Sequence, residues 1–293
     1  MAIFSYIMSV LRLYAVGMKL LLYQLIHRPF ISPVLPDQHG KVAIVTGGSR
    51  GIGYEIVKRL INLGMHVIIA SHDEHQGLVV MERLHKECAE AHGGVMLVPE
   101  QKSDDGLELH FSINYLSHFL LTRLLLDSLV HSGTEECSRV ISICSSAHYV
   151  SDRNLQDFHR TQDYCPHASY ARSKLAQLLF TYRLHQELRS GGYAVTVNAV
   201  DPGMVDTQLY RYMSFPEKLV LKPVAWLLFR TPAQAADTVL YAAASQDFEG
   251  VSSCYVHEGK PVKSSPASYD AELQDELWRN TCRMLRLPVS INK

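Results

Sequence analysis

The chain has 293 residues, of which 47% are hydrophobic and 19% are charged, with 28 Lys and Arg against 29 Asp and Glu. This length and apolar content suit one sizeable domain, and a net charge of −1 argues against a nucleic-acid-binding protein. The six cysteines show no CxxC spacing, so free thiols are expected and no metal site is predicted.

The first element is an apolar stretch, residues 1–26, interrupted by Arg12 and Lys19. Residues 1–28 are long enough for a spanning helix, which needs ~20 apolar residues. The two cations share one helical face, which favours a helix lying in the membrane interface or a signal anchor whose cations snorkel. A buried terminal helix is the alternative. Residues 29–40 then form a linker.

A strand and a glycine-rich turn come next. Residues 41–46 are an apolar run, and residues 54–63 follow a helical pattern. Glycine allows a sharp turn with positive φ and a close approach to phosphate, and a helix N-terminus offers free N–H groups. Strand, turn and helix together predict a dinucleotide-binding site. Its predicted cofactor-binding residues are Thr46, Gly47, Ser49, Arg50, Gly51, Ile52 and Gly53.

Residues 64–70 form the predicted second strand. The segment that follows this strand is too short for the further strands of a doubly wound sheet. From Ser71 to Gly106 about 36 residues are available, whereas two further pairs of helix and strand need roughly 50. The apolar spacing predicts a helix over residues 75–91, and residues 95–98 are the only strand candidate.

Tyr170 and Lys174 lie four residues apart in a helical pattern, so the phenol and the ammonium share a face. We expect the charge of Lys174 to lower the pKa of Tyr170 from ~10 toward the range of a proton-transfer group. Taken alone, this spacing also occurs on solvated helices. Other motifs must therefore support the catalytic interpretation.

Three such motifs surround the pair. Asn114 lies in a helical pattern, a strand-like run ends in Ser145 and Ser146, and a second strand, residues 193–200, ends in a Pro-Gly turn. Residues 215–230 alternate apolar blocks with cations and suit a substrate lid. Residues 269–287 read as a helix that either packs on a partner subunit or closes the domain.

In chain order, Thr46-Gly47-xxx-Gly51-x-Gly53, Asn114, Ser145-Ser146, Tyr170-xxx-Lys174 and Asp201-Pro202-Gly203 resemble the motifs of the short-chain dehydrogenase/reductase family. The resemblance includes its retinol-dehydrogenase branch and extends from the N-terminal apolar segment to about residue 286. It implies an α/β fold, in which residues 41–287 form a single dinucleotide-binding domain with a Rossmann-like, doubly wound parallel sheet.

The resemblance also implies the catalytic residues Asn114, Ser146, Tyr170 and Lys174, with Ser145 in reserve for Ser146. In the family, the tyrosine exchanges a proton with the carbonyl oxygen and the serine hydroxyl hydrogen-bonds that oxygen. Lys174 is expected to hold the nicotinamide ribose as well. Asn114 is expected to fix a water in a proton relay.

Further cofactor contacts follow from the same resemblance. Pro202, Gly203, Val205 and Thr207 would support the nicotinamide, beside Tyr170 and Lys174. At the adenosine end, Arg50 and His72 favour the 2′-phosphate of NADP, whereas Asp73 keeps NAD open. Gly94 stands where the family has the last residue of an Asn-Asn-Ala-Gly motif, and the rest of that motif is missing.

The short segment therefore predicts an internal deletion within residues 71–106, which removes the third strand and part or all of the fourth. Two functions remain open. The first is an NAD(P)-dependent oxidoreductase that interconverts an alcohol and a carbonyl on a lipophilic substrate such as a retinoid, isoprenoid or steroid. The second is a catalytically silent variant that acts at most by binding. The expected location is the endoplasmic reticulum membrane, with secretion as the alternative, and a homodimer is possible.

Overall fold

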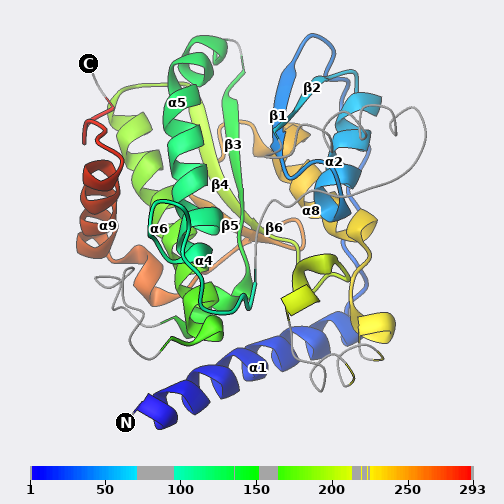
Figure 1. Ribbon diagram of the computed structural model, residues 1–293. Coiled ribbons are helices and arrows are strands. Elements are labelled where there is room, and N and C mark those ends of the chain that lie inside the picture. The colour runs from blue at the N-terminus through cyan, green and yellow to red at the C-terminus, as the bar shows by residue number, and fades with distance from the viewer. Residues whose placement is uncertain are drawn as a thin grey trace.

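The computed structural model describes residues 2–70, 96–134, 136–151, 164–212, 219, 223 and 225–291 (Figure 1). Its elements in chain order are α1 (Ala2–Ile26), β1 (Val42–Thr46), α2 (Gly51–Asn62), β2 (His66–Ala70), α4 (Leu109–Phe111), the π-helix η1 (Ser112–Leu116), α5 (Ser117–Ser132), β3 (Ser138–Ile143), η2 (Ser146–Val150), α6 (Pro166–Ser190), β4 (Val195–Asp201), η3 (Gln208–Tyr212), α8 (Pro232–Ala244), η4 (Gln246–Phe248), β5 (Cys254–His257), β6 (Lys260–Val262), η5 (Pro266–Tyr269) and α9 (Ala271–Met284). The α/β class and the parallel, Rossmann-like arrangement are as predicted.

Local sequence explains where several helices begin. Thr231 caps α8 in a reciprocal capping box with Gln234, and Pro232 occupies the first turn, where a missing N–H costs nothing. The side chain of Asp270 accepts from the amide of Leu273 at the start of α9. These caps fix the start of α8, which packs against the sheet, and the start of α9, which packs on α6.

One half of the sheet is complete. β3, β4 and β5 are parallel, β6 returns antiparallel, and the strand order is β3-β4-β5-β6. All seven residues of β4 are buried, as expected for an apolar parallel strand that helices cover on both faces. One core, around Phe119, Leu179 and Trp278, lies between the sheet and α5, α6 and α9. A second core lies under α2 and α8.

The other half of the expected sheet consists of two strands. β1 and β2 are parallel and form a separate two-stranded sheet, and within the described ranges no strand joins β1 to β3. In the expected doubly wound sheet, a strand stands between β1 and β3. It is the strand that the sequence predicts to be partly or wholly deleted, and it is not the strand labelled β4 here. Val42 and Ile44 of β1 are 59% and 42% exposed, so this edge lacks a covering neighbour among the described residues.

The predicted strand at residues 95–98 is wrong for its described part. Residues 96–98 are not in a strand, and Leu97 has a φ of +53°, which an extended strand does not contain. Instead, the amide of Val98 donates to Nε2 of His110, and its carbonyl accepts from the hydroxyl of Tyr164. The predicted helix at residues 75–91, together with His72, Asp73 and Gly94, lies outside the described residues.

The N-terminal apolar stretch is a helix, as predicted, and α1 lies below the carboxyl ends of the strands in Figure 1. By length and composition, residues Tyr6–Ile26 could cross a membrane. In this structure, however, Leu21 and Gln24 are buried against the body of the protein.

The C-terminal helix closes the domain. Leu273, Leu277 and Trp278 of α9 are buried, and the indole N–H of Trp278 donates to the carbonyl of Val289 at 2.7 Å. The five described cysteines are free thiols.

Candidate functional site

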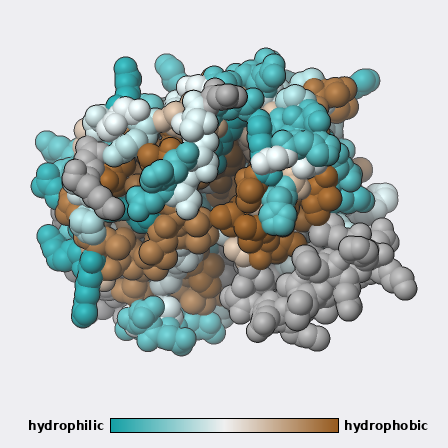
Figure 2. Space-filling model, turned by 90° about the horizontal axis from the view of Figure 1, so that it is seen from above, coloured by the Kyte–Doolittle hydropathy of each residue, from teal (hydrophilic) through white to brown (hydrophobic). Residues whose placement is uncertain are grey.

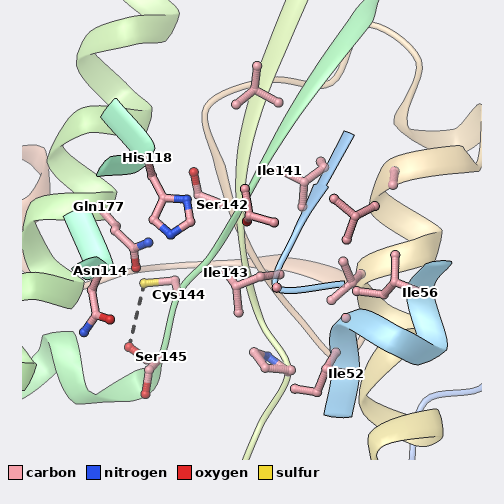
Figure 3. A pocket seen from close by; sticks show the side chains of 18 of the residues that line it. Ile52, Ile56, Asn114, His118, Ile141, Ser142, Ile143, Cys144, Ser145 and Gln177 are labelled. Carbon is pink, nitrogen blue, oxygen red and sulfur yellow. Dashed lines mark hydrogen bonds between the residues drawn. The ribbon is translucent and has the colours of Figure 1, made fainter. Parts of the chain in front are cut away.

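A single long cavity holds the candidate site. It has a volume of about 1650 Å³ and runs from the amino ends of β1 and β3, near Lys41 and Glu136, to α1 at their carboxyl ends. Figure 3 shows Asn114, His118 and Gln177 on one side of this cavity and Ile52 and Ile56 on the other. Figure 2 looks at the amino ends of the strands and shows apolar side chains on that face.

The cavity therefore occupies the space between the two sheets. Most of the β1 side chains that line it are apolar, β3 contributes Val140, Ile141 and Ile143 beside three polar residues, and α5 adds Leu121, Leu125 and Leu129. At its amino end, Lys41 forms an ion pair with Glu136, so a charge contact joins the two halves there.

The glycine-rich turn lies at the carboxyl end of β1. Gly47 and Gly51 have φ values of +63° and +53°, a conformation that glycine adopts without strain. A Cβ on Gly53 would stand 2.2 Å from the carbonyl oxygen of Gly47, so only glycine allows α2 to approach the turn this closely. Thr46 and Ile52 line the cavity on either side.

This turn fits a dinucleotide phosphate. α2 begins at Gly51 with no side chain capping its N–H groups, and helix N-termini attract anions. Ser49 is buried, and its hydroxyl has no hydrogen-bond partner among the described residues. A buried hydroxyl without a partner is costly, and a phosphate oxygen would satisfy it.

Tyr170 and Lys174 both lie on α6 and both face the cavity. The Lys174 ammonium is 5.9 Å from the centre of the Tyr170 ring. It donates to the carbonyl of Ile143, at the end of β3, and to Oε1 of Gln177, each at 2.9 Å. The Lys174 side chain is thus held between α6 and the end of β3.

The expected direction of the Tyr170 pKa is wrong for this structure. Complete burial raises the pKa of Tyr170, and the nearby Ser145 side chain offsets only part of that rise. Burial also lowers the pKa of Lys174, because it disfavours the ammonium form. The sequence showed the spacing of the two groups but not their desolvation.

The two adjacent serines face different partners. Ser145 lies near the phenol of Tyr170, where its hydroxyl acts to lower the pKa of that phenol. The Ser146 hydroxyl instead donates to Oδ2 of Asp201 and lies 3.5 Å from the hydroxyl of Tyr255. A hydroxyl that donates to a carboxylate has no second proton to donate to a substrate oxygen.

Asp201 is the buried acid of the site. Burial by itself would raise its pKa, but the charge of His257 and hydrogen bonds from Ser146, Tyr255 and the amide of Gly203 outweigh it and lower the pKa. The Tyr255 hydroxyl donates to Oδ2 at 2.6 Å, and the Gly203 amide donates to Oδ1 at 2.9 Å.

Asn114 is buried in the π-helix between α4 and α5, a rare geometry that often marks functional sites. Its Nδ2 donates to the hydroxyl of Ser173 at 3.0 Å, and Ser173 donates to the carbonyl of Tyr170 at 2.8 Å. Asn114 is thereby connected to α6.

The turn after β4 completes the ring of residues. Gly203 has a φ of +83°, and Val205 pairs with Arg230 in an isolated parallel bridge. The Thr207 side chain lies 3.5 Å from the place a Cβ would take on Gly51, so this turn and the glycine-rich turn meet.

Most predicted site residues thus converge. Those that line the cavity are Thr46, Gly47, Arg50, Gly51, Ile52, Gly53, Asn114, Ser145, Ser146, Tyr170, Lys174, Pro202, Gly203, Val205 and Thr207. Ser49 is buried within the glycine turn, and His72 and Gly94 are outside the described residues. Within the described part of the chain, no group of histidine, cysteine and acidic side chains could hold a metal ion.

Several residues of the site were missed. Gln177 is one helical turn after Lys174 on the same face, a spacing that could have indicated it. Asp201 was named only within the Asp201-Pro202-Gly203 motif and given no role, although it ends a mostly apolar strand, which is a signal for a buried acid. Gln24, the polar residue near the end of α1, gave no such signal.

Comparison with known proteins gives the same family. The profile of the short chain dehydrogenase family matches residues 41–103 and 93–217. Polyprenol dehydrogenase of Danio rerio is 44% identical over 316 residues, covering 96% of this chain and 98% of that protein, and polyprenol dehydrogenase of Homo sapiens is 40% identical. Retinol dehydrogenase 13 of Mus musculus is 32% identical, covering 86% of this chain and 85% of that protein.

The alignment with the zebrafish protein is longer than the chain itself, so it contains positions at which this chain has no residue.

Solved structures agree in fold. An uncharacterised protein of Mycobacterium paratuberculosis has a TM-score of 0.68 at 24% identity, covering 90% of this chain and 100% of that one. An NAD(P)-dependent gluconate 5-dehydrogenase of Beutenbergia cavernae with bound NADP has a TM-score of 0.55 at 18% identity, covering 76% of this chain and 96% of that one.

Family profile, relatives and site geometry agree, and the chain belongs to the short-chain dehydrogenase family of oxidoreductases, with relatives among the retinol dehydrogenases.

Proposed function

We propose that this protein is an NAD(P)-dependent oxidoreductase that interconverts an alcohol and a carbonyl on a lipophilic substrate. The observation that carries the proposal is the meeting of the glycine-rich turn, Tyr170 and Lys174 around one cavity. The apolar lining of that cavity and the names of the relatives support a long isoprenoid alcohol, with a retinoid or a steroid as alternatives.

The proposed roles follow from the contacts. A bound nicotinamide dinucleotide would supply or accept the hydride. Tyr170, which burial keeps protonated, would give its proton to the carbonyl oxygen during reduction. Ser145, which lies near the Tyr170 phenol, would donate a hydrogen bond to the same oxygen.

Ser146 then takes a different role from the one expected. Because it donates to Asp201, it would hold the turn at residues 201–203 in place rather than bind the substrate oxygen. Lys174 and Asn114 keep their proposed roles as ribose ligand and relay residue. Comparing Ser145→Ala with Ser146→Ala tests the assignment, since the larger fall in kcat should come from Ser145.

We propose NADP as the cofactor, with NAD as the alternative. Arg50 lies at the cavity, at the N-cap of α2, where its charge suits a 2′-phosphate. We further propose that α1 attaches the enzyme to the endoplasmic reticulum membrane, with secretion as the alternative. A homodimer remains part of the proposal without a surface assigned to it.

A second candidate, a catalytically silent variant, is supported by the separation of the sheet into two parts. An internal deletion would account both for this separation and for the alignment that exceeds the chain in length. The space between β1 and β3 would then be wider than a dinucleotide cleft needs.

Titration of the full chain with NADPH and NADH, followed by nucleotide fluorescence and melting temperature, tests the two candidates. An enzyme should bind NADPH and gain stability, as any ligand of the folded state does. No response to either nucleotide would overturn the enzymatic proposal and favour the silent variant.

Tyr170→Phe tests the catalytic assignment. It should reduce turnover by at least ~10²-fold and leave NADPH binding nearly unchanged. Tyr115→Phe is the matched control, because Tyr115 is equally buried but hydrogen-bonds Thr281 away from the cavity. Equal losses of activity in both variants would mean that the phenol of Tyr170 has no catalytic part.

A further inference from the structure

α1 is attached to the body by a buried amide. The Gln24 side chain accepts from the amide of Met204 at 2.8 Å, and its Nε2 donates to the carbonyls of Met204 at 3.2 Å and Leu228 at 3.1 Å. Met204 belongs to the turn after β4. Gln24 thus connects α1 both to the turn after β4 and to the segment before Arg230.

Other contacts continue along the same side of the helix. A Cβ on Gly17 would lie 3.9 Å from Sδ of Met204, and the ring of Tyr14 lies 5.9 Å from that of His167. Leu21, one turn before Gln24, is 5% exposed and lines the cavity. α1 is therefore a wall of the catalytic cavity.

A different side of α1 is apolar and open. The exposed residues recur at intervals of three, four or seven positions, as on one helical face. They are Phe4, Ile7, Leu11, Met18, Leu22 and Leu25, each between 48% and 71% exposed. Arg12 and Lys19 lie on a neighbouring face, where they would reach lipid phosphates while the apolar stripe enters the acyl region.

Apolar residues of a second segment adjoin this stripe. The bond from Gln24 to Leu228 places residues 225–228 beside the C-terminal part of α1, and Trp226 and Leu227 are 85% and 71% exposed. Tryptophan is enriched at the membrane–water interface. Both segments thus expose apolar side chains beside the cavity wall that α1 forms.

We propose that the apolar surface of these two segments docks on a lipid bilayer while α1 stays bound to the catalytic body, so that the helix lies in the membrane interface and does not span it. A spanning orientation would break the three hydrogen bonds of Gln24 and carry its amide and two cations into hydrocarbon. In the docked orientation, an apolar substrate passes from the acyl region along α1 into the cavity. This inference rests on the proposed membrane association.

A reversible cross-link tests the docked orientation. Gly17→Cys/Met204→Cys places a thiol at each side of the contact between α1 and Met204, and a disulfide between them would fix α1 on the body. Oxidised and reduced forms of the full chain are mixed with vesicles of phosphatidylcholine and phosphatidylserine and separated by flotation. We expect the cross-link to form and both forms to float to the same extent.

The outcomes separate the two proposals. Flotation of the reduced form alone would overturn the docked orientation, because the helix would have to leave the body to meet lipid. A disulfide that forms in vesicle-free protein but not in vesicle-bound protein would overturn it as well. If the unaltered chain does not float, the proposed membrane association is itself wrong.

Leu11→Asp provides a second measurement without altering the body. The substitution removes a leucine that the proposed docking buries in the bilayer, and it adds a charge there. Vesicle binding should therefore weaken about tenfold or more. Leu124→Asp is the matched control, since Leu124 is 68% exposed on α5, away from α1. Equal weakening by both substitutions would overturn the assignment of the surface.

Discussion

β4 and β1 are both short, apolar, parallel strands, yet all seven residues of β4 are buried and none of the five residues of β1 is. β4 has a hydrogen-bonded strand on each side and helices on both faces. Among the described residues β1 has only β2 beside it, and the cavity lies on its other side. Apolar sequence makes a strand, but burial comes from its neighbours, so the two halves should differ in how they respond to substitution.

Trp278→Ala should produce the largest loss, because its ring is 1% exposed in the core of the complete half. Removing a buried tryptophan leaves a cavity and costs ~3–5 kcal/mol of unfolding free energy. Urea denaturation followed by circular dichroism measures it. A loss below 1 kcal/mol would contradict the view that this half carries most of the stability.

Asp201→Asn should cost ~2–3 kcal/mol at neutral pH, since it weakens charge-assisted hydrogen bonds at the end of β4. The folded-state pKa of Asp201 is lowered, so its stabilisation is present above the unfolded value of ~3.9 and is lost as pH falls through the folded value. The stabilities of wild type and variant should therefore converge in acid, as urea titrations across pH would show. A difference that did not shrink would contradict this origin.

Ile44→Ala should cost less than ~1 kcal/mol, because a side chain that is 42% exposed loses little burial when it is shortened. The same urea measurement applies. Leu179→Ala, at 0% exposure in the complete half, is the matched comparison and should cost ~2–5 kcal/mol. Similar losses for both would mean that β1 is covered as well as the core is.

Lys41→Ala should have the smallest effect, ~0.2–1 kcal/mol, because its ion pair with Glu136 is largely exposed to water. This contact joins the two halves at the amino end of the cavity. The loss should shrink further in high salt, which screens exposed charges. A loss that salt does not change would show that the pair is not a solvent-exposed contact.

Much of the fold could be predicted from sequence because it follows local patterns. The apolar run at residues 41–46 became β1, the helical pattern at residues 54–63 overlaps α2, and the run at residues 193–200 became β4. The convergence of Gly47, Asn114, Tyr170 and Lys174 could be anticipated only from the family resemblance.

The rest depends on packing that no local pattern records. Residues 95–98 are apolar enough for a strand, yet Val98 is fully buried through contacts with His110 and Tyr164 instead. The raised pKa of Tyr170 depends on how many neighbours surround the phenol, and spacing along α6 carries no such information. The division of labour between Ser145 and Ser146 depends on Asp201, which is 55 positions away from Ser146 in the chain.

The docking of α1 through Gln24 has a practical consequence for anyone who purifies this protein. Apolar leading segments are often trimmed to obtain a well-behaved sample for assays. Here, removing residues 1–28 would delete one side of the candidate active-site chamber and would release the Met204 turn. Substrate preferences measured on such a shortened enzyme would describe a different chamber from the one that the whole chain builds.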